Sequence, residues 1–159
     1  MSEAPAAPGP PPLRPFGLIL HHEGRWSHEG GPIANARLRA AFDRGVRFLP
    51  VEAVFVVQLG RYRGQIEVEE AGFFVRSFDP ASGLIALSDG SEERLAPDSL
   101  HVSTRDGALL CRVKRDLVAT GLLARFTHAA QAQLLGAVEE GPDGPFLRIA
   151  GRAVRLPAL

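Results

Sequence analysis

The chain has few of the residues that usually reveal a protein's chemistry. Its 159 residues include one cysteine, one tryptophan, one tyrosine, one methionine and a single lysine, Lys114. One cysteine, Cys111, excludes an intramolecular disulfide and a cysteine-rich zinc site. Because Cys111 lies in an alternating apolar segment with no base beside it, we expect a buried, unreactive thiol.

Neither sign of charge is in excess, and long apolar runs are missing. Lysine and arginine together number 18, as do aspartate and glutamate. A chain without net charge lacks the positive field that draws nucleic acid or an anionic membrane surface. No apolar run is long enough to span a bilayer, and the first residues lack the basic and apolar regions of a secretory signal. We therefore expect a cytoplasmic protein that binds neither nucleic acid nor membrane.

Catalytic and cofactor-binding motifs are absent as well. The sequence has no G-x-S-x-G, G-x-G-x-x-G, phosphate-binding P-loop or H-E-x-x-H pattern. His21 and His22 are adjacent on an expected strand, so their side chains should oppose each other and make a poor metal site. The sequence predicts no catalytic residue, no cofactor and no metal, and it favours a binding protein over an enzyme.

What is present is the composition of a folded globular chain, with 45% apolar and 23% charged residues. Residues 1–15 are rich in alanine and proline, and we expect a disordered tail there. The remainder is expected to form an N-terminal lobe over 16–79 and a C-terminal lobe over 80–159.

Apolar alternation and turn residues predict an α+β fold with mainly antiparallel strands. Strands are expected at 17–20, 25–28, 53–59, 65–69, 73–78, 83–87, 93–95, 100–104 and 108–113, and a final hairpin at 137–140 and 146–156. A helix is expected at 34–44, with Gly45 as its C-cap. Helical sequence is also expected at 116–136, broken near Gly121, with Thr127 capping its second part.

A weak internal repeat indicates that the two lobes are related. A strand at 24–28, the helix at 34–44 and the segment 55–61 have counterparts at 107–111, in the helical sequence that ends near Gly136, and at 146–152. Two similar lobes, each with antiparallel strands and one or two helices, would enclose a cleft between them. Ligand sites favour such interfaces.

Two segments carry a resemblance to a known family. Residues 24–33 read GRWSHEGGPI, and residues 66–73 read IEVEEAGF, an I-x-V-E-acid-A-x-F pattern. With the helix between them and a weaker match over 117–135 and 146–156, they resemble the bacterial domain-of-unknown-function family 1285. Gly72 stands where that family prefers proline.

The resemblance implies a duplicated α+β fold whose C-terminal half is loosely similar to pleckstrin-homology-like folds. It also implies a ligand-binding protein in signal transduction, with a nucleotide-like ligand between the halves. No enzymatic activity is firmly attached to the family.

The most distinctive candidates for ligand binding lie in the first segment. Trp26 and His28 share one face of an expected strand, and Gly31 precedes a helix whose N-terminus attracts anions. Trp26 would stack on a planar ligand and His28 would hydrogen-bond it; alternatively, Trp26 is a core residue and His28 a surface residue. Arg61 and Arg152 occupy equivalent positions in the repeat and could clamp a phosphate or carboxylate together.

Three functions stay open at this stage. The first is a small-molecule sensor or adaptor in bacterial signalling, with an anionic or nucleotide-like ligand between the lobes at the five residues just named. The second is a protein–protein interaction module that binds a signalling partner without a small ligand. The third is a hydrolase that uses two of Glu67, Glu69 and His28, although Glu67, Glu69 and Glu70 fit the solvated face of a strand better.

Overall fold

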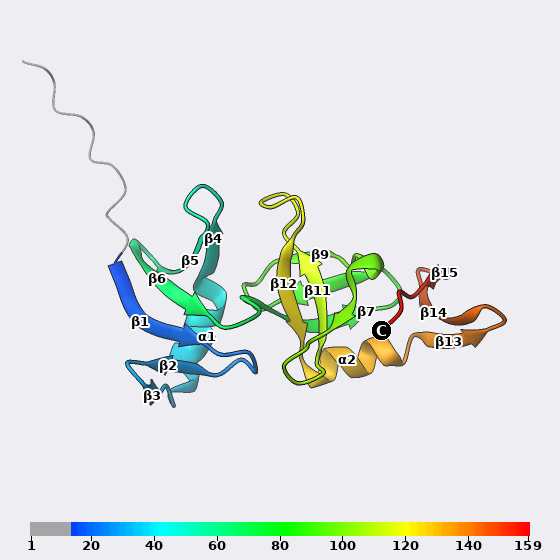
Figure 1. The fold of residues 1–159 in the computed structure, drawn as a ribbon, viewed down its shortest axis with the longest axis horizontal. Helices are drawn as coiled ribbons and strands as arrows, with labels where there is room; N and C mark the ends of the chain where they lie inside the picture. The colour runs from blue at the N-terminus through cyan, green and yellow to red at the C-terminus, as the bar shows by residue number, and fades with distance from the viewer. Residues whose placement is uncertain (1–13) are drawn as a thin grey trace, which may run out of the picture.

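The structure, a computed structural model, describes residues 14–159 (Figure 1). Strand β1 begins at Arg14, two residues before the expected start of order. The rest of the expected disordered tail lies outside the described residues. Within the described part of the chain, no helix is long and apolar enough to cross a membrane.

The first large sheet lies at one end of the molecule (Figure 1). Its elements are β1 (Arg14–Leu20), β2 (Trp26–His28), β3 (Gly31–Pro32), helix α1 (Ala36–Gly45), β4 (Val46–Leu49), β5 (Val54–Leu59) and β6 (Tyr62–Val68). The strand order is β3-β2-β1-β6-β5-β4. Strands β1 and β6 pair in parallel, and the other neighbours are antiparallel.

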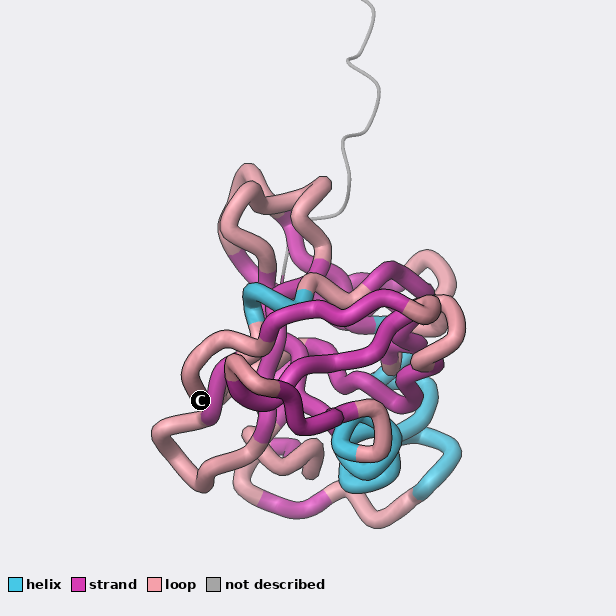
Figure 2. Tube along the Cα trace, turned by 90° about the vertical axis from the view of Figure 1, so that its right-hand side faces the viewer, coloured by secondary structure: helices cyan, strands magenta, loops and turns pink. Residues whose placement is uncertain are grey.

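The second large sheet lies in the middle of the molecule, and a small third sheet lies at the far end (Figure 1). The second comprises β7 (Phe73–Asp79), β8 (Leu84–Leu87), β9 (Glu92–Arg94), the 3₁₀ turn η1 (Pro97–Ser99), β10 (His101–Val102), β11 (Leu109–Val113) and β12 (Leu122–Phe126), in the order β10-β11-β12-β7-β8-β9. Helix α2 (His128–Leu135) follows it, and then β13 (Val138–Gly141), β14 (Gly144–Ile149) and β15 (Arg152–Arg155). Viewed along the long axis, the helical ribbon gathers on one side of the strands, apart from a short turn (Figure 2).

The two large sheets follow the same path, which confirms the expected duplication. In each, the first strand is central, the next two run outward, the chain crosses to the opposite edge, and three strands return to the centre. The first and sixth strands then pair in parallel, β1 with β6 and β7 with β12. Helix α1 makes the crossover in the first sheet, and η1 makes it in the second.

The repeated parts are not the ones that the sequence indicates. By topology, β5 (Val54–Leu59) corresponds to β11, whereas β14 and β15 belong to the third sheet, outside the repeat. Residues 55–61 and 146–152 are therefore not equivalent positions. The first sheet ends at Val68 and the second begins at Phe73, so we propose residues 69–72 as the division between lobes, instead of the expected one after residue 79.

The structure differs from the sequence-based expectations at three places. Leu122–Phe126 is strand β12, not helix, because β11 and β7 hydrogen-bond to its two edges and override a helix-compatible sequence. Residues 146–156 divide into two strands at a turn with positive φ at Ala150 and Gly151. Strand β4 was not expected at all.

Of the two predicted helix caps, Thr127 is confirmed and Gly45 is wrong. Thr127 does cap α2, since its side chain accepts a hydrogen bond from the Ala130 N–H. Gly45 is not a left-handed C-cap: it is the last residue of α1, and Val46 follows it in extended conformation.

A single hydrophobic core runs through all three sheets. It includes Leu18 and Trp26 from the first sheet, Phe73 and Phe78 from the second, and Leu147 from the third. The lobes are therefore packed as one body. Cys111 is buried in this core, as expected, and burial raises the pKa of its thiol to about 12.

We predict that Gly45→Ala destabilises the protein. A Cβ at Gly45 would lie 2.5 Å from the backbone carbonyl oxygen of Gln58 on β5. The backbone of a paired strand cannot move aside as easily as the end of a flexible side chain. Overpacking of this kind costs about 1–3 kcal/mol, which outweighs the gain of up to about 1 kcal/mol from replacing a helical glycine. Urea unfolding measures the change.

Gly136→Ala at the end of α2 is the matched control, because its Cβ would meet nothing closer than 3.4 Å and its φ of −65° suits alanine. A Gly45→Ala protein as stable as the Gly136→Ala protein would contradict the close approach of α1 and β5.

A second prediction concerns Cys111. A thiol with a pKa of about 12 is almost fully protonated at neutral pH and is also shielded from solvent. Ellman's reagent should therefore leave the native protein unlabelled and label it once per chain in denaturing urea. Rapid labelling of the native protein would show that this part of the core opens.

Candidate functional site

Three segments meet where the first large sheet passes into the second, and together we call them the junction. They are the β1–β2 turn (residues 21–25), the connection between β6 and β7 (69–72) and the β10–β11 turn (103–108). The Glu69 N–H donates to the Leu20 carbonyl at 2.9 Å, which fixes the connection against the end of β1. Most of the ion pairs in the described part of the chain involve a junction residue.

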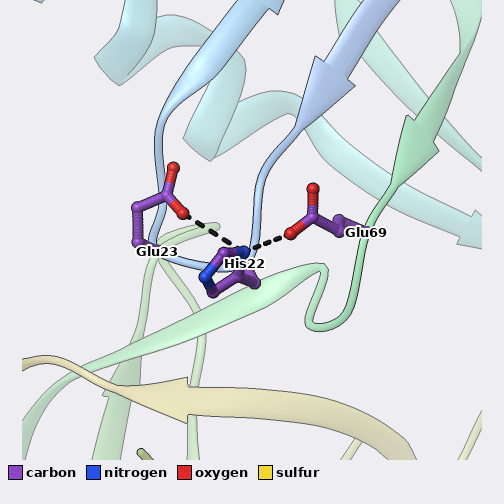
Figure 3. Close-up of side chains that lie close together, drawn as sticks. All are labelled: His22, Glu23 and Glu69. Carbon is purple, nitrogen blue, oxygen red and sulfur yellow. Dashed lines mark hydrogen bonds and ion pairs between the residues drawn. The ribbon is translucent and has the colours of Figure 1, made fainter. Parts of the chain in front are cut away.

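His22 is at the centre of this group (Figure 3). Its Nδ1 atom contacts Glu69 Oε1 and lies 3.2 Å from Glu23 Oε2. Its Nε2 atom faces Asp106 Oδ2 of the β10–β11 turn at 3.8 Å. Residues from both large sheets thus converge on one imidazole.

His21 holds the other side of the same carboxylate. Its Nδ1 lies 3.2 Å from Glu69 Oε2, and its Nε2 lies 2.8 Å from the Ser27 hydroxyl. The expectation that the adjacent histidines oppose each other was wrong, because β1 ends at Leu20 and both residues lie in a turn. Glu69 also departs from the expected solvated strand face, since β6 ends at Val68.

Guanidinium groups complete the junction. Arg105 approaches Glu69 twice, with Nη1 3.4 Å from Oε1 and Nη2 donating to the backbone carbonyl at 3.3 Å. Arg125 Nη1 lies 2.8 Å from Asp106 Oδ2. Hydrogen bonds from His22 and His21 lower the pKa of Glu69 to about 2, and the Arg125 contact lowers the pKa of Asp106. Both carboxylates are therefore ionised at neutral pH.

Trp26 forms a second link between the sheets. The side chain is fully buried, packs on Phe42 at 5.3 Å between ring centroids, and donates from Nε1 to Asp43 Oδ1 at 2.8 Å. The other oxygen of Asp43 accepts from Arg76 Nη2 of β7, also at 2.8 Å. The geometry of Trp26 is that of the alternative considered above, a core residue.

The other predicted site residues are on the surface and are not all together. His28 and Gly31 face each other across β2 and β3, and Arg61 lies in the turn between β5 and β6. Arg152 is in β15, at the opposite end of the long axis from β2 (Figure 1). Ligand contact by these residues stays a prediction, but one cleft does not contain all of them.

His28 lies on the rim of an apolar hollow of about 450 Å³ on the first sheet. The lining residues are Phe16, Leu18, His28, Ile33, Leu38, Phe42 and Leu59. A larger hollow of about 680 Å³ lies beside the β13–β14 turn, but half of its lining is glycine and proline, and Phe146 is its one large apolar side chain. Sequence reasoning missed the hollow beside His28 because its walls come from four separate elements, β1, β2, α1 and β5, and from Ile33 in the connection before α1.

Comparison with solved structures identifies two similar folds. A DUF1285 family protein from Silicibacter pomeroyi DSS-3 superposes with a TM-score of 0.59 at 17% identity, over 94% of this chain and 88% of that one. A second, from Shewanella baltica OS155, gives a TM-score of 0.51 at 13% identity, over 77% of this chain and 91% of that one. The chain resembles the DUF1285 family. At these identities the likeness to DUF1285 proteins is one of fold.

Comparisons based on the amino-acid sequence alone found no match. No protein-family model matches it, and no curated protein does either. The duplicated α+β fold implied by the DUF1285 resemblance is confirmed by the two like sheets.

The lowered pKa of Glu69 predicts an acid-dependent loss of stability. A carboxyl whose pKa falls from 4.5 to about 2 on folding stabilises the native state fully above pH 4.5, and this contribution disappears as the pH falls toward 2. Glu69→Gln should lower stability at pH 7 and flatten the pH profile in that window. Urea midpoints measured from pH 7 to pH 2 test this.

The exposed neighbour Glu67 provides the control for that experiment. Glu67→Gln should keep the profile of the unmodified protein. If Glu69→Gln also keeps that profile, the two histidines do not hold the Glu69 carboxylate in solution.

Proposed function

We propose that this chain is a small-molecule binding protein whose first sheet receives the apolar part of an amphipathic anion. The observation that carries the proposal is the hollow of about 450 Å³ beside His28. Ligand pockets commonly have volumes of about 300–1,000 Å³, apolar walls and a few polar groups that orient the ligand.

The walls of the hollow suit an apolar body. Leu18 and Phe42 form a buried floor, whereas Leu38 is 41% exposed and stands at the edge. Covering these side chains removes apolar surface from water, which favours binding by roughly 25 cal/mol for each Å² buried.

The rim of the hollow suits an anionic group. His28 is the one polar side chain in its lining, with about half of its surface exposed. Arg39 Nη1 donates to the carbonyl of Ile33, another lining residue, at 3.2 Å and so keeps a guanidinium group near the edge. An imidazole and a guanidinium can both donate to a carboxylate or phosphate.

The strand register argues against the hydrolase alternative. His28 pairs with Leu18 and Glu67 pairs with Ile19, two successive residues of β1. Successive residues point to opposite faces of a sheet, so His28 and Glu67 do not converge. Glu69 contacts His21 and His22 at the junction instead.

The apolar lining with one polar rim residue favours a small amphipathic ligand over a protein partner, which would cover a wider apolar patch. A sensor or adaptor role in bacterial signalling, and a cytoplasmic location, are parts of the proposal that rest on the sequence. A nucleotide-like ligand would place its base in the hollow and its phosphate at His28.

Trp26 provides the readout for a binding experiment, because it is the only tryptophan and packs on Phe42, which lines the hollow. We predict that decanoate or a naphthalene sulfonate changes its fluorescence saturably and raises the melting temperature. Adenosine monophosphate in the same titration tests the nucleotide-like arm.

The variants separate the hollow from the rest of the surface. Leu38→Glu places a charge at the edge of the hollow and should weaken binding of the probe at least about tenfold, or about 1.4 kcal/mol. His28→Ala should weaken binding of the anionic probe more than binding of an uncharged analogue. Leu135→Glu changes an exposed leucine of α2 and should have no effect. Equal loss in Leu38→Glu and Leu135→Glu, or no binding of any probe, would overturn the proposal.

A further inference from the structure

We propose that His22, Glu23 and Glu69 form a binding site for one divalent transition-metal ion at the junction. This site is separate from the hollow, so it stands or falls independently of the proposed function. One ligand atom from each residue lies within 4.8 Å of the others. Figure 3 shows the two carboxylates approaching the same edge of the imidazole from different segments of the chain.

The spacing of the donor atoms fits direct coordination. The distance from His22 Nδ1 to Glu23 Oε2 is 3.2 Å, and Glu69 Oε1 contacts the same nitrogen. Zinc–nitrogen and zinc–oxygen bonds of about 2.0–2.2 Å place neighbouring tetrahedral ligands roughly 3.3–3.5 Å apart. One ion can therefore bind all three atoms after small side-chain adjustments.

Each of the two carboxylates turns one oxygen toward His22 and holds the other against a different side chain. Glu23 Oε1 accepts from Arg25 Nε at 3.0 Å, which leaves Oε2 toward His22. Glu69 Oε2 lies against His21, whereas Oε1 faces His22 and also has Arg105 Nη1 at 3.4 Å, which must move aside for an ion. Such outer contacts orient metal ligands and strengthen binding.

Coordination selects one tautomer of His22. An ion on Nδ1 replaces the proton that this nitrogen donates to Glu69, so the neutral ring keeps its proton on Nε2. Asp106 Oδ2 faces Nε2 at 3.8 Å, which is longer than a hydrogen bond, and a small side-chain shift would bring it within reach. A carboxylate behind the second ring nitrogen is the usual arrangement for a metal-binding histidine.

Charge at the junction leaves room for a cation. Four carboxylates lie there, those of Glu23, Glu69, Glu70 and Asp106, against three guanidinium groups, those of Arg25, Arg105 and Arg125. Glu70 is not one of the ligands, since its Oε2 accepts from the Ser103 hydroxyl at 2.8 Å and faces Arg105 at 3.9 Å.

The donor set indicates the class of metal. An imidazole nitrogen with two carboxylates suits zinc, manganese, iron or cobalt, whereas calcium and magnesium prefer oxygen ligands alone. His22 and Glu23 are part-exposed, so an ion can reach them from solvent.

Cobalt titration of the chelator-treated full-length protein tests the site. We expect one Co²⁺ per chain, with visible absorption bands that Zn²⁺ abolishes and that Mg²⁺ and Ca²⁺ do not. Glu23→Gln, a change at a part-exposed residue, should weaken binding at least about tenfold, and His22→Ala should abolish it. Urea unfolding of each variant verifies that it is folded.

His128→Ala is the matched control, because His128 is an exposed histidine of α2 that is not part of the His22, Glu23 and Glu69 group. It should bind cobalt as the unmodified protein does. No binding at about 100-fold excess metal, binding unchanged in folded Glu23→Gln and His22→Ala, or loss of binding in His128→Ala would each overturn the proposal.

Discussion

The parallel pairing of first and last strands is the constraint on which the rest of the structure depends. β1 lies beside β6 and β7 beside β12, and each pair joins segments about 50 residues apart. Because β6 continues into β7 through only four residues, the centres of the two sheets are forced close together. The turns that flank these strands then meet at the junction, and the Phe55 ring of β5 packs 6.2 Å from the Phe73 ring of β7.

Much of the fold could be predicted from the sequence because its signals are local. Alternating apolar residues predict β6, a short apolar run predicts β7, and the amphipathic pattern predicts α1. β12 could not be predicted in this way. Leu122–Phe126 has leucines and an alanine that suit a helix, and only its two neighbouring strands make it extended. The repeat was detected, but its boundaries follow the strand pairing, which no local pattern reveals.

The candidate sites were harder to predict because their residues are far apart in the sequence. Glu69 is 47 residues from His22, and adjacent strand ends bring them together. The local patterns place His21 and His22 on one expected strand and Glu69 at the end of another, and they do not indicate that these two strand ends are neighbours. Trp26 shows a different difficulty, because the sequence motif around it is distinctive and therefore suggests a binding residue. In the structure its side chain is buried and donates a hydrogen bond to Asp43, as a core residue does.

The arrangement of strands also sets an order of assembly during protein synthesis. Every strand that the first sheet needs lies before residue 69, so this sheet can close while the second is still being translated. The second sheet cannot close until β12 has left the ribosome, since β7 waits for that partner. Slow pairing of distant strands exposes sheet edges to aggregation, and a finished first sheet gives the nascent β7 a surface on which to pack during this wait.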